Sequence, residues 1–158
     1  MKKLFKLLFM NFDVFKLVQN DKTLFTGVMS GKELTNSNIQ VDEWQPNMDM
    51  TGYQRIKNLQ KIDKISKFLI KSKGIMPSTI LISVRESKVT YTPKNHYFGI
   101  LAMPNDPNMN VIDGQHRIEG LRRAINVDKK FENFILPVIF LCPNLVDSKS
   151  NSDIEEGK

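Results

Sequence analysis

The sequence predicts an α+β fold in which helices pack on a mixed sheet. Its 158 residues correspond to one domain of ordinary size, and a hydrophobic content of 41% is sufficient to build a core. Segments with strand and helix periodicity follow one another as strands, helix, strands, helix and strand. This irregular order favours a compact α+β domain over a doubly wound sheet.

Strands are predicted where apolar, β-branched or alternating residues form short runs bounded by turn residues. The two runs on either side of Pro93 are expected to form a hairpin. The expected strands are 12–19, 23–30, 78–84, 89–93, 97–103, 111–112 and 134–142.

Two segments have the period of amphipathic helices. In residues 54–72, apolar residues recur every three or four positions with lysines among them, and Pro77 follows the end of the pattern. Residues 114–126 repeat this pattern. Residues 31–52 are polar and mixed, and we expect a loop there.

The expected domain is 12–143, with an N-terminal extension at 1–11 and a disordered polar tail at 144–158. Lys6 interrupts the short apolar start, which argues against a signal peptide or a membrane span of ~20 residues. The single cysteine, Cys142, excludes an internal disulfide. We therefore expect a cytoplasmic protein with no membrane partner.

The formal net charge is +6, from 23 Lys and Arg against 17 Asp and Glu. This balance favours polyanionic partners such as nucleic acid or nucleotides. A lysine-rich composition without such a partner is equally compatible with the numbers.

The segment VIDGQHRIEGLRRA at 111–124 changes from strand to helix at a glycine. A helix start there presents free backbone N–H groups and the positive end of the helix dipole, which together attract anions such as phosphate. Gln115, His116 and Arg117 add side-chain donors, and the planar guanidinium suits two phosphate oxygens. The alternative is an ordinary capped helix with a solvated first turn.

Asp113 differs from its neighbours because a carboxylate repels phosphate. Three roles are open to it: capping the helix, holding a Mg²⁺ that bridges phosphates, or orienting water for hydrolysis. His116 can serve as a phosphate donor or as a general base, since its titration lies near neutral pH.

A second polar cluster, GYQR at 52–55, precedes the first predicted helix. It again combines a glycine with a glutamine and an arginine, here Gln54 and Arg55. Two such corners could converge on one ligand.

The motif DGQHR at 113–117, with GYQR at 52–55 upstream, resembles the DGQHR-domain family, which includes DndB. The resemblance spans 45–142, and the family is similar in turn to the ParB/sulfiredoxin superfamily. A DGQQR variant occurs in modification-dependent restriction enzymes of the GmrSD type. DndB-like chains are considerably longer, so we expect a truncated form, an excised domain or a minimal member.

The resemblance implies a ParB-like mixed sheet and a nucleotide-phosphate pocket. ATP or another nucleoside triphosphate with Mg²⁺ would be bound there, and DNA would be a partner. The chain could also form a homo-oligomer or need a missing C-terminal domain. The residues implied are Asp113 and His116 as catalytic groups, Gly114, Gln115, Arg117, Gln54 and Arg55 as phosphate ligands, and Asp113 as the Mg²⁺ ligand.

We therefore expect a nucleotide-binding domain, with hydrolysis as an open question, in a DndB-like regulator of DNA modification and restriction. Three alternatives remain. One is a nucleotide-independent DNA-binding module, and another is an interaction domain without chemistry. The third is a nuclease, although Asp113, Glu119, His96 and His116 match no recognisable metal-binding pattern.

Overall fold

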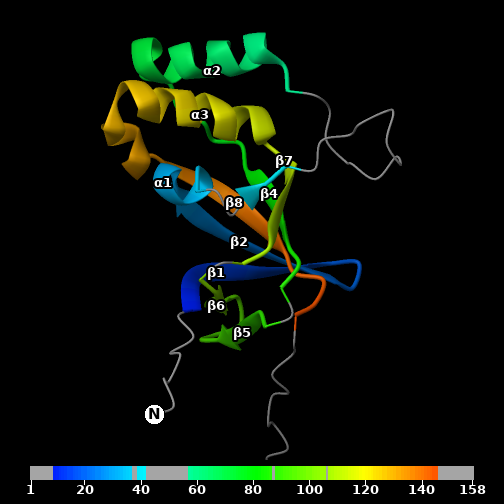
Figure 1. The fold of residues 1–158 in the computed structure, drawn as a ribbon. Coiled ribbons are helices and arrows are strands. Elements are labelled where there is room, and N and C mark those ends of the chain that lie inside the picture. The colour runs from blue at the N-terminus through cyan, green and yellow to red at the C-terminus, as the bar shows by residue number, and fades with distance from the viewer. Residues whose placement is uncertain (1–8, 37–38, 42–56, 87, 106, 146–158) are drawn as a thin grey trace, which may run out of the picture.

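The computed structural model describes residues 9–36, 39–41, 57–86, 88–105 and 107–145. They form a mixed eight-stranded sheet with the helices on one face, so the predicted α+β class is confirmed (Figure 1). The elements are β1 (Phe9–Gln19), β2 (Lys22–Ser30), α1 (Gly31–Leu34), β3 (Ile39–Gln40), α2 (Leu59–Ser72), β4 (Ile80–Val84), β5 (Thr90–Pro93), β6 (Phe98–Pro104), β7 (Met109–Asp113), α3 (Gln115–Val127), the 3₁₀ helix η1 (Lys129–Asn133) and β8 (Ile135–Leu141).

The strand order is β3-β7-β4-β8-β2-β1-β6-β5. Two pairs are parallel, β3 with β7 and β4 with β8, and the other pairs are antiparallel. Strand β4 therefore lies between β7, which leads into α3, and β8 at the centre of the sheet.

The sheet is strongly curled. In a flat sheet, three strand spacings separate β2 from β5 by roughly 14 Å. The rings of Phe25 on β2 and Tyr91 on β5 nevertheless lie 4.9 Å apart, centroid to centroid. The rings of Phe12 on β1 and Phe140 on β8 are 5.1 Å apart across β2. The concave side thus encloses a core of aromatic and aliphatic side chains.

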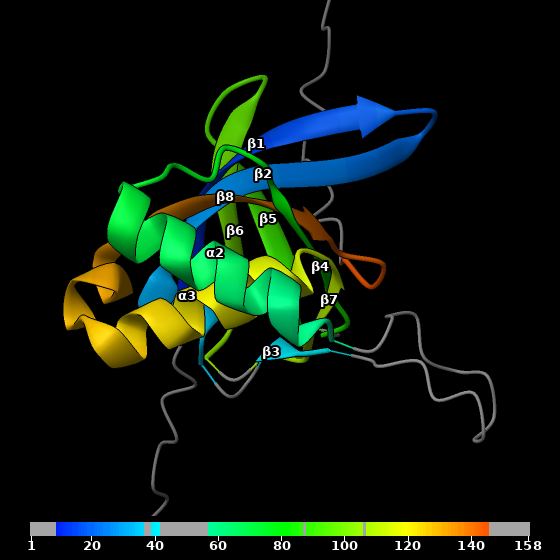
Figure 2. The same cartoon turned by 90° about the horizontal axis from the view of Figure 1, so that it is seen from above.

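Helices α2 and α3 lie on this concave side and run nearly parallel, with α3 between α2 and the sheet (Figures 1 and 2). They approach closely at Gly120, where a Cβ would lie 2.4 Å from Cγ2 of Ile65 on α2. Ile62 and Leu69 of α2 and Leu121 of α3 are buried. The helix pair therefore depends on a small residue at its crossing.

Most predicted strands and both long helices are present. The predicted hairpin around Pro93 is confirmed by the antiparallel β5–β6 pair. Strand β1 begins at Phe9, inside the predicted extension, because residues 9–15 pair with β6. The part of the predicted tail from residue 146 onward lies outside the described residues.

Two expectations about the helices were wrong. The first helix begins at Leu59 instead of residue 54, because the Asn58 side chain caps it by accepting from the N–H groups of Gln60 and Lys61. The expected loop at 31–52 contains α1 and β3. Within the described ranges, no helix is long and apolar enough to cross a bilayer.

Candidate phosphate-binding site

The motif lies at the corner where β7 ends and α3 begins. Gly114 is the residue before the first turn of α3 and has a φ of +103°, which L side chains rarely adopt. A Cβ there would also lie 2.5 Å from Cδ1 of Ile80 on β4. The sequence therefore needs glycine at this corner for both conformation and space.

The first turn of α3 carries no side-chain cap and no acidic residue. The Gly114 carbonyl accepts from the N–H groups of Arg117 and Ile118 at 3.0 and 3.1 Å. No carboxylate of the first turn of α3 therefore neutralises the positive end of the helix dipole. Such an end favours an anionic ligand.

Arg117 lies folded over the glycine. Its Nη2 is 3.3 Å from Oδ2 of Asp113, and a Cβ on Gly114 would lie 3.2 Å from the same nitrogen. Its Nη1 is buried and has no hydrogen-bond partner among the described residues. A buried charged donor without a partner is costly, so this guanidinium has capacity to bind a further acceptor.

A second helix start lies beside this corner. The backbone N–H of Asn58, directly before α2, donates to Nε2 of His116 at 2.9 Å. Lys57 lies 3.7 Å from the carboxylate of Glu119 on α3. Both helices have their N-terminal ends at the same end of the pair (Figures 1 and 2), so the positive ends of two dipoles lie together.

His116 has a defined role in joining the two helices. Because Nε2 accepts from Asn58, the ring is neutral and Nδ1 carries its proton. Burial lowers the pKa of His116, Lys61 and Lys57 lower it further, and Asp113 opposes them. Electrostatics and hydrogen bonding therefore both favour the neutral form.

The structure places the other predicted residues differently. Asp113 has a mostly exposed carboxylate, 76% accessible, whereas Gln115 is 3% exposed and lies beneath the corner. Gln54 and Arg55 lie outside the described residues. Sequence reasoning missed Asn58, although an asparagine before a periodic apolar run is a common helix-start signal.

Among the described residues, Asp113 offers a Mg²⁺ ion an exposed carboxylate at this corner. No group of three or more His, Cys, Asp or Glu side chains comes together among the described residues. Asp113 fits the usual mode in which one or two carboxylates and the phosphates of a nucleotide hold the ion. The corner does not match a dedicated all-protein metal site.

Comparison with protein families identifies a family for the chain. A sequence model of the family named DndB and described as DNA-sulfur modification-associated matches residues 12–150. The chain belongs to the DndB family. Both the DGQHR motif and the start of α2 lie inside the matched range, so this DndB-family chain has its candidate site within the family domain.

Membership associates the chain with DNA-sulfur modification. No curated protein matched the chain significantly. No solved structure matched it either, so the expected likeness to the ParB/sulfiredoxin fold stays a prediction.

Proposed function

We propose that this DndB-family chain binds the phosphates of a nucleoside triphosphate at the Gly114 corner. The observation that carries the proposal is the guanidinium of Arg117, whose Nη1 is buried without a partner among the described residues. It lies beside the uncapped start of α3. A phosphate oxygen would satisfy the guanidinium and the helix dipole together.

The surrounding charges support this ligand. Lys61 lies close enough to His116 to lower its pKa, so a cation from α2 contributes to the field at the corner. Neither helix has an acidic residue in its first turn. Asp113, exposed next to Arg117, would hold a Mg²⁺ that arrives with the triphosphate.

Hydrolysis of the bound nucleotide would depend on Asp113 more than on His116. The Nε2 atom of His116 already accepts the Asn58 N–H, so this nitrogen cannot take a proton without breaking the link between the helices. Asp113 has an exposed carboxylate that can orient a water molecule. Release of inorganic phosphate that Asp113→Asn abolishes would support this role.

Nucleotide binding is tested by thermal unfolding with ATP or GTP and Mg²⁺. Nucleotide at one hundred times its Kd stabilises a protein by about 2.7 kcal/mol. At about 2–4 °C per kcal/mol, the Tm should rise by about 5–10 °C. Arg117→Ala should remove this rise, whereas Arg123→Ala, an exposed arginine further along α3, should keep it. An unchanged Tm at millimolar nucleotide would contradict the proposal.

A second candidate function is nucleotide-independent DNA binding through α2. Four exposed lysines occur along this helix, which has Asp63 as its acidic residue. Lys67 pairs with Asp63 at 2.7 Å, which leaves the other three to face solvent. The three are Lys61, Lys64 and Lys71. Cations in this arrangement suit the DNA backbone.

The second candidate predicts binding to duplex DNA that weakens steeply with salt. The double variant Lys61→Ala/Lys64→Ala should lower the slope of log K against log salt by about 2, because each lost phosphate contact removes ~0.9. Lys94→Ala, an exposed lysine in the β5–β6 turn, is the matched control. Fluorescence anisotropy at several salt concentrations measures both. A slope that the double variant leaves unchanged would argue against α2 as the DNA-binding face.

A further inference from the structure

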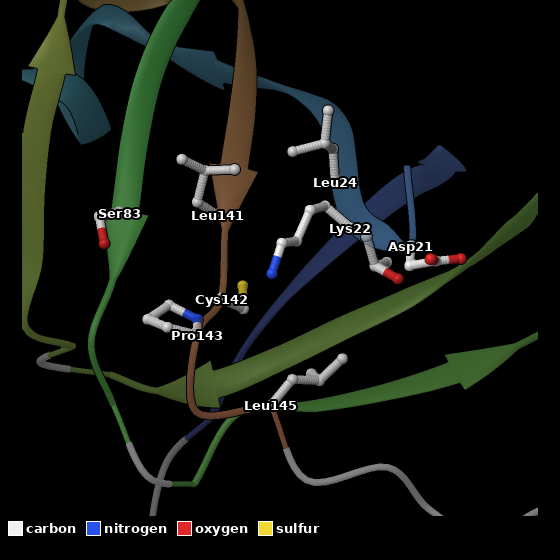
Figure 3. Close-up of a pocket in the computed structure, with 9 residues that line it drawn as sticks. Asp21, Lys22, Leu24, Ser83, Leu141, Cys142, Pro143 and Leu145 are labelled. Atoms are coloured by element: carbon white, nitrogen blue, oxygen red, sulfur yellow. The ribbon is translucent and has the colours of Figure 1, made fainter. Parts of the chain in front are cut away.

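A separate cavity of about 670 Å³ lies where β2 begins and β4 and β8 end (Figure 3). It falls within the range of roughly 300–1,000 Å³ typical of small-molecule sites. Its lining combines apolar side chains with a few polar ones. The lining residues are Asp21, Lys22, Thr23, Leu24, Ser83, Leu141, Cys142, Pro143 and Leu145.

The cavity is built from the convex face of the sheet and a folded-back turn. Ser83 on β4 pairs with Leu141 on β8, so these two residues form adjacent parts of the floor. After β8 the chain turns, with the N–H of Leu145 donating to the Cys142 carbonyl at 3.2 Å. Nδ2 of Asn144 donates to the Arg85 carbonyl at 3.3 Å, and this hydrogen bond links the turn after β8 to the residue that follows β4.

Lys22 supplies the positive charge. It follows the two-residue turn between β1 and β2, in which Asn20 and Asp21 have φ values of 45° and 61°. Its side chain extends over the cavity from β2, whereas the Asp21 carboxylate points away (Figure 3). Lys22 forms no ion pair within the described part of the chain.

Ser83 lies on β4 and Cys142 directly after β8, and both line the cavity. Ser83 is 7% exposed. Burial raises the pKa of the Cys142 thiol to about 12. The cavity therefore offers apolar side chains, the hydroxyls of Thr23 and Ser83, and a cation at its rim.

We propose that this cavity binds a small molecule with an apolar body and one carboxylate. Leu24, Leu141 and Leu145 would contact the body, and Lys22 would pair with the carboxylate at the rim. The Lys22 ammonium, which has no ion-pair partner among the described residues, is complementary to an anionic amphiphile and disfavours a cationic one.

This cavity is independent of the phosphate-binding corner. Ile80 and Ile82 of β4 are buried in the core on the helix side, and Ile80 contacts Gly114. Ser83 alternates with them and therefore faces the opposite side of the sheet. A failure to bind nucleotide would therefore not contradict ligand binding in the cavity, and a failure to bind a ligand in the cavity would not contradict nucleotide binding.

The test is titration of the full chain with decanoate, followed by ¹H–¹⁵N shifts. We expect saturable shifts at Ser83, Cys142 and Leu145. Lys22→Ala should weaken decanoate binding by about 5-fold, as expected for a rim ion pair. Lys94→Ala should leave it unchanged, and binding of the uncharged decanol should be the same with and without Lys22.

Two results would overturn the proposal. One is that decanoate shifts appear around the exposed Phe15 and its half-buried neighbour Phe98 on the sheet surface and not at the cavity. The other is that Lys22→Ala affects decanoate and decanol equally, since the carboxylate would then play no part.

Discussion

At Gly114, backbone conformation and packing exclude a side chain for separate reasons. The φ of +103° strains any L residue, and Cδ1 of Ile80 occupies the place of a Cβ. The same bend lets the Arg117 guanidinium lie over the start of α3. One residue therefore determines both the stability of the corner and the access of a ligand to it.

Gly114→Ala is expected to lower the free energy of unfolding by about 2–4 kcal/mol, from backbone strain and overpacking together. Ile80→Val removes Cδ1, so in that background the same substitution should cost about 1 kcal/mol less. Urea denaturation of both single variants and the double variant measures this coupling. Strictly additive losses would mean that Ile80 is not the obstacle.

At the scale of the elements, some sequence signals are sufficient to predict where a helix or hairpin lies and others are not. The Asn58 cap and the Ser30–Glu33 capping box begin α2 and α1, and both were readable as start signals. The apolar period of α2 instead suggested an earlier start, because periodicity does not mark the first residue. The Pro93 hairpin was predictable since turn residues separate two alternating runs.

The contact between α2 and α3 depends on the protonation state of His116. Its Nε2 accepts the Asn58 N–H, and a protonated ring could only donate there. Its pKa lies below the ordinary 6.5, mainly through burial. The unfolded chain then binds the proton more readily, so this contribution to stability is present above pH 6.5 and is lost as pH falls below it.

His116→Ala should therefore lower stability by about 1 kcal/mol at pH 7, for one hydrogen bond. The difference between wild type and variant should shrink between pH 7 and pH 5. Tm values across this range provide the measurement. His96→Ala, which removes the other histidine of the chain, should leave the wild-type pH dependence intact. A difference that stays constant with pH would refute the proposed role of the imidazole.

At the scale of the whole molecule, the features that matter most arise from long-range packing. The motif itself indicated an anion site, but the meeting of His116 with Asn58, 58 residues away in sequence, follows from the parallel packing of two helices. The curl that brings Phe25 to Tyr91 likewise depends on four strands at once. No local pattern encodes either contact, because each depends on which strands become neighbours.

Two phenylalanines on adjacent strands differ strongly in exposure because the sheet is curled. Phe25 on β2 is 1% exposed and contacts Tyr91, whereas Phe15 on β1 is 55% exposed on the outer face. Phe25→Ala is expected to destabilise the fold by about 3–5 kcal/mol, through lost burial and the cavity it leaves. Phe15→Ala should cost less than about 1 kcal/mol. Urea unfolding compares them directly, and equal losses would mean that the sheet does not close over Phe25 in solution.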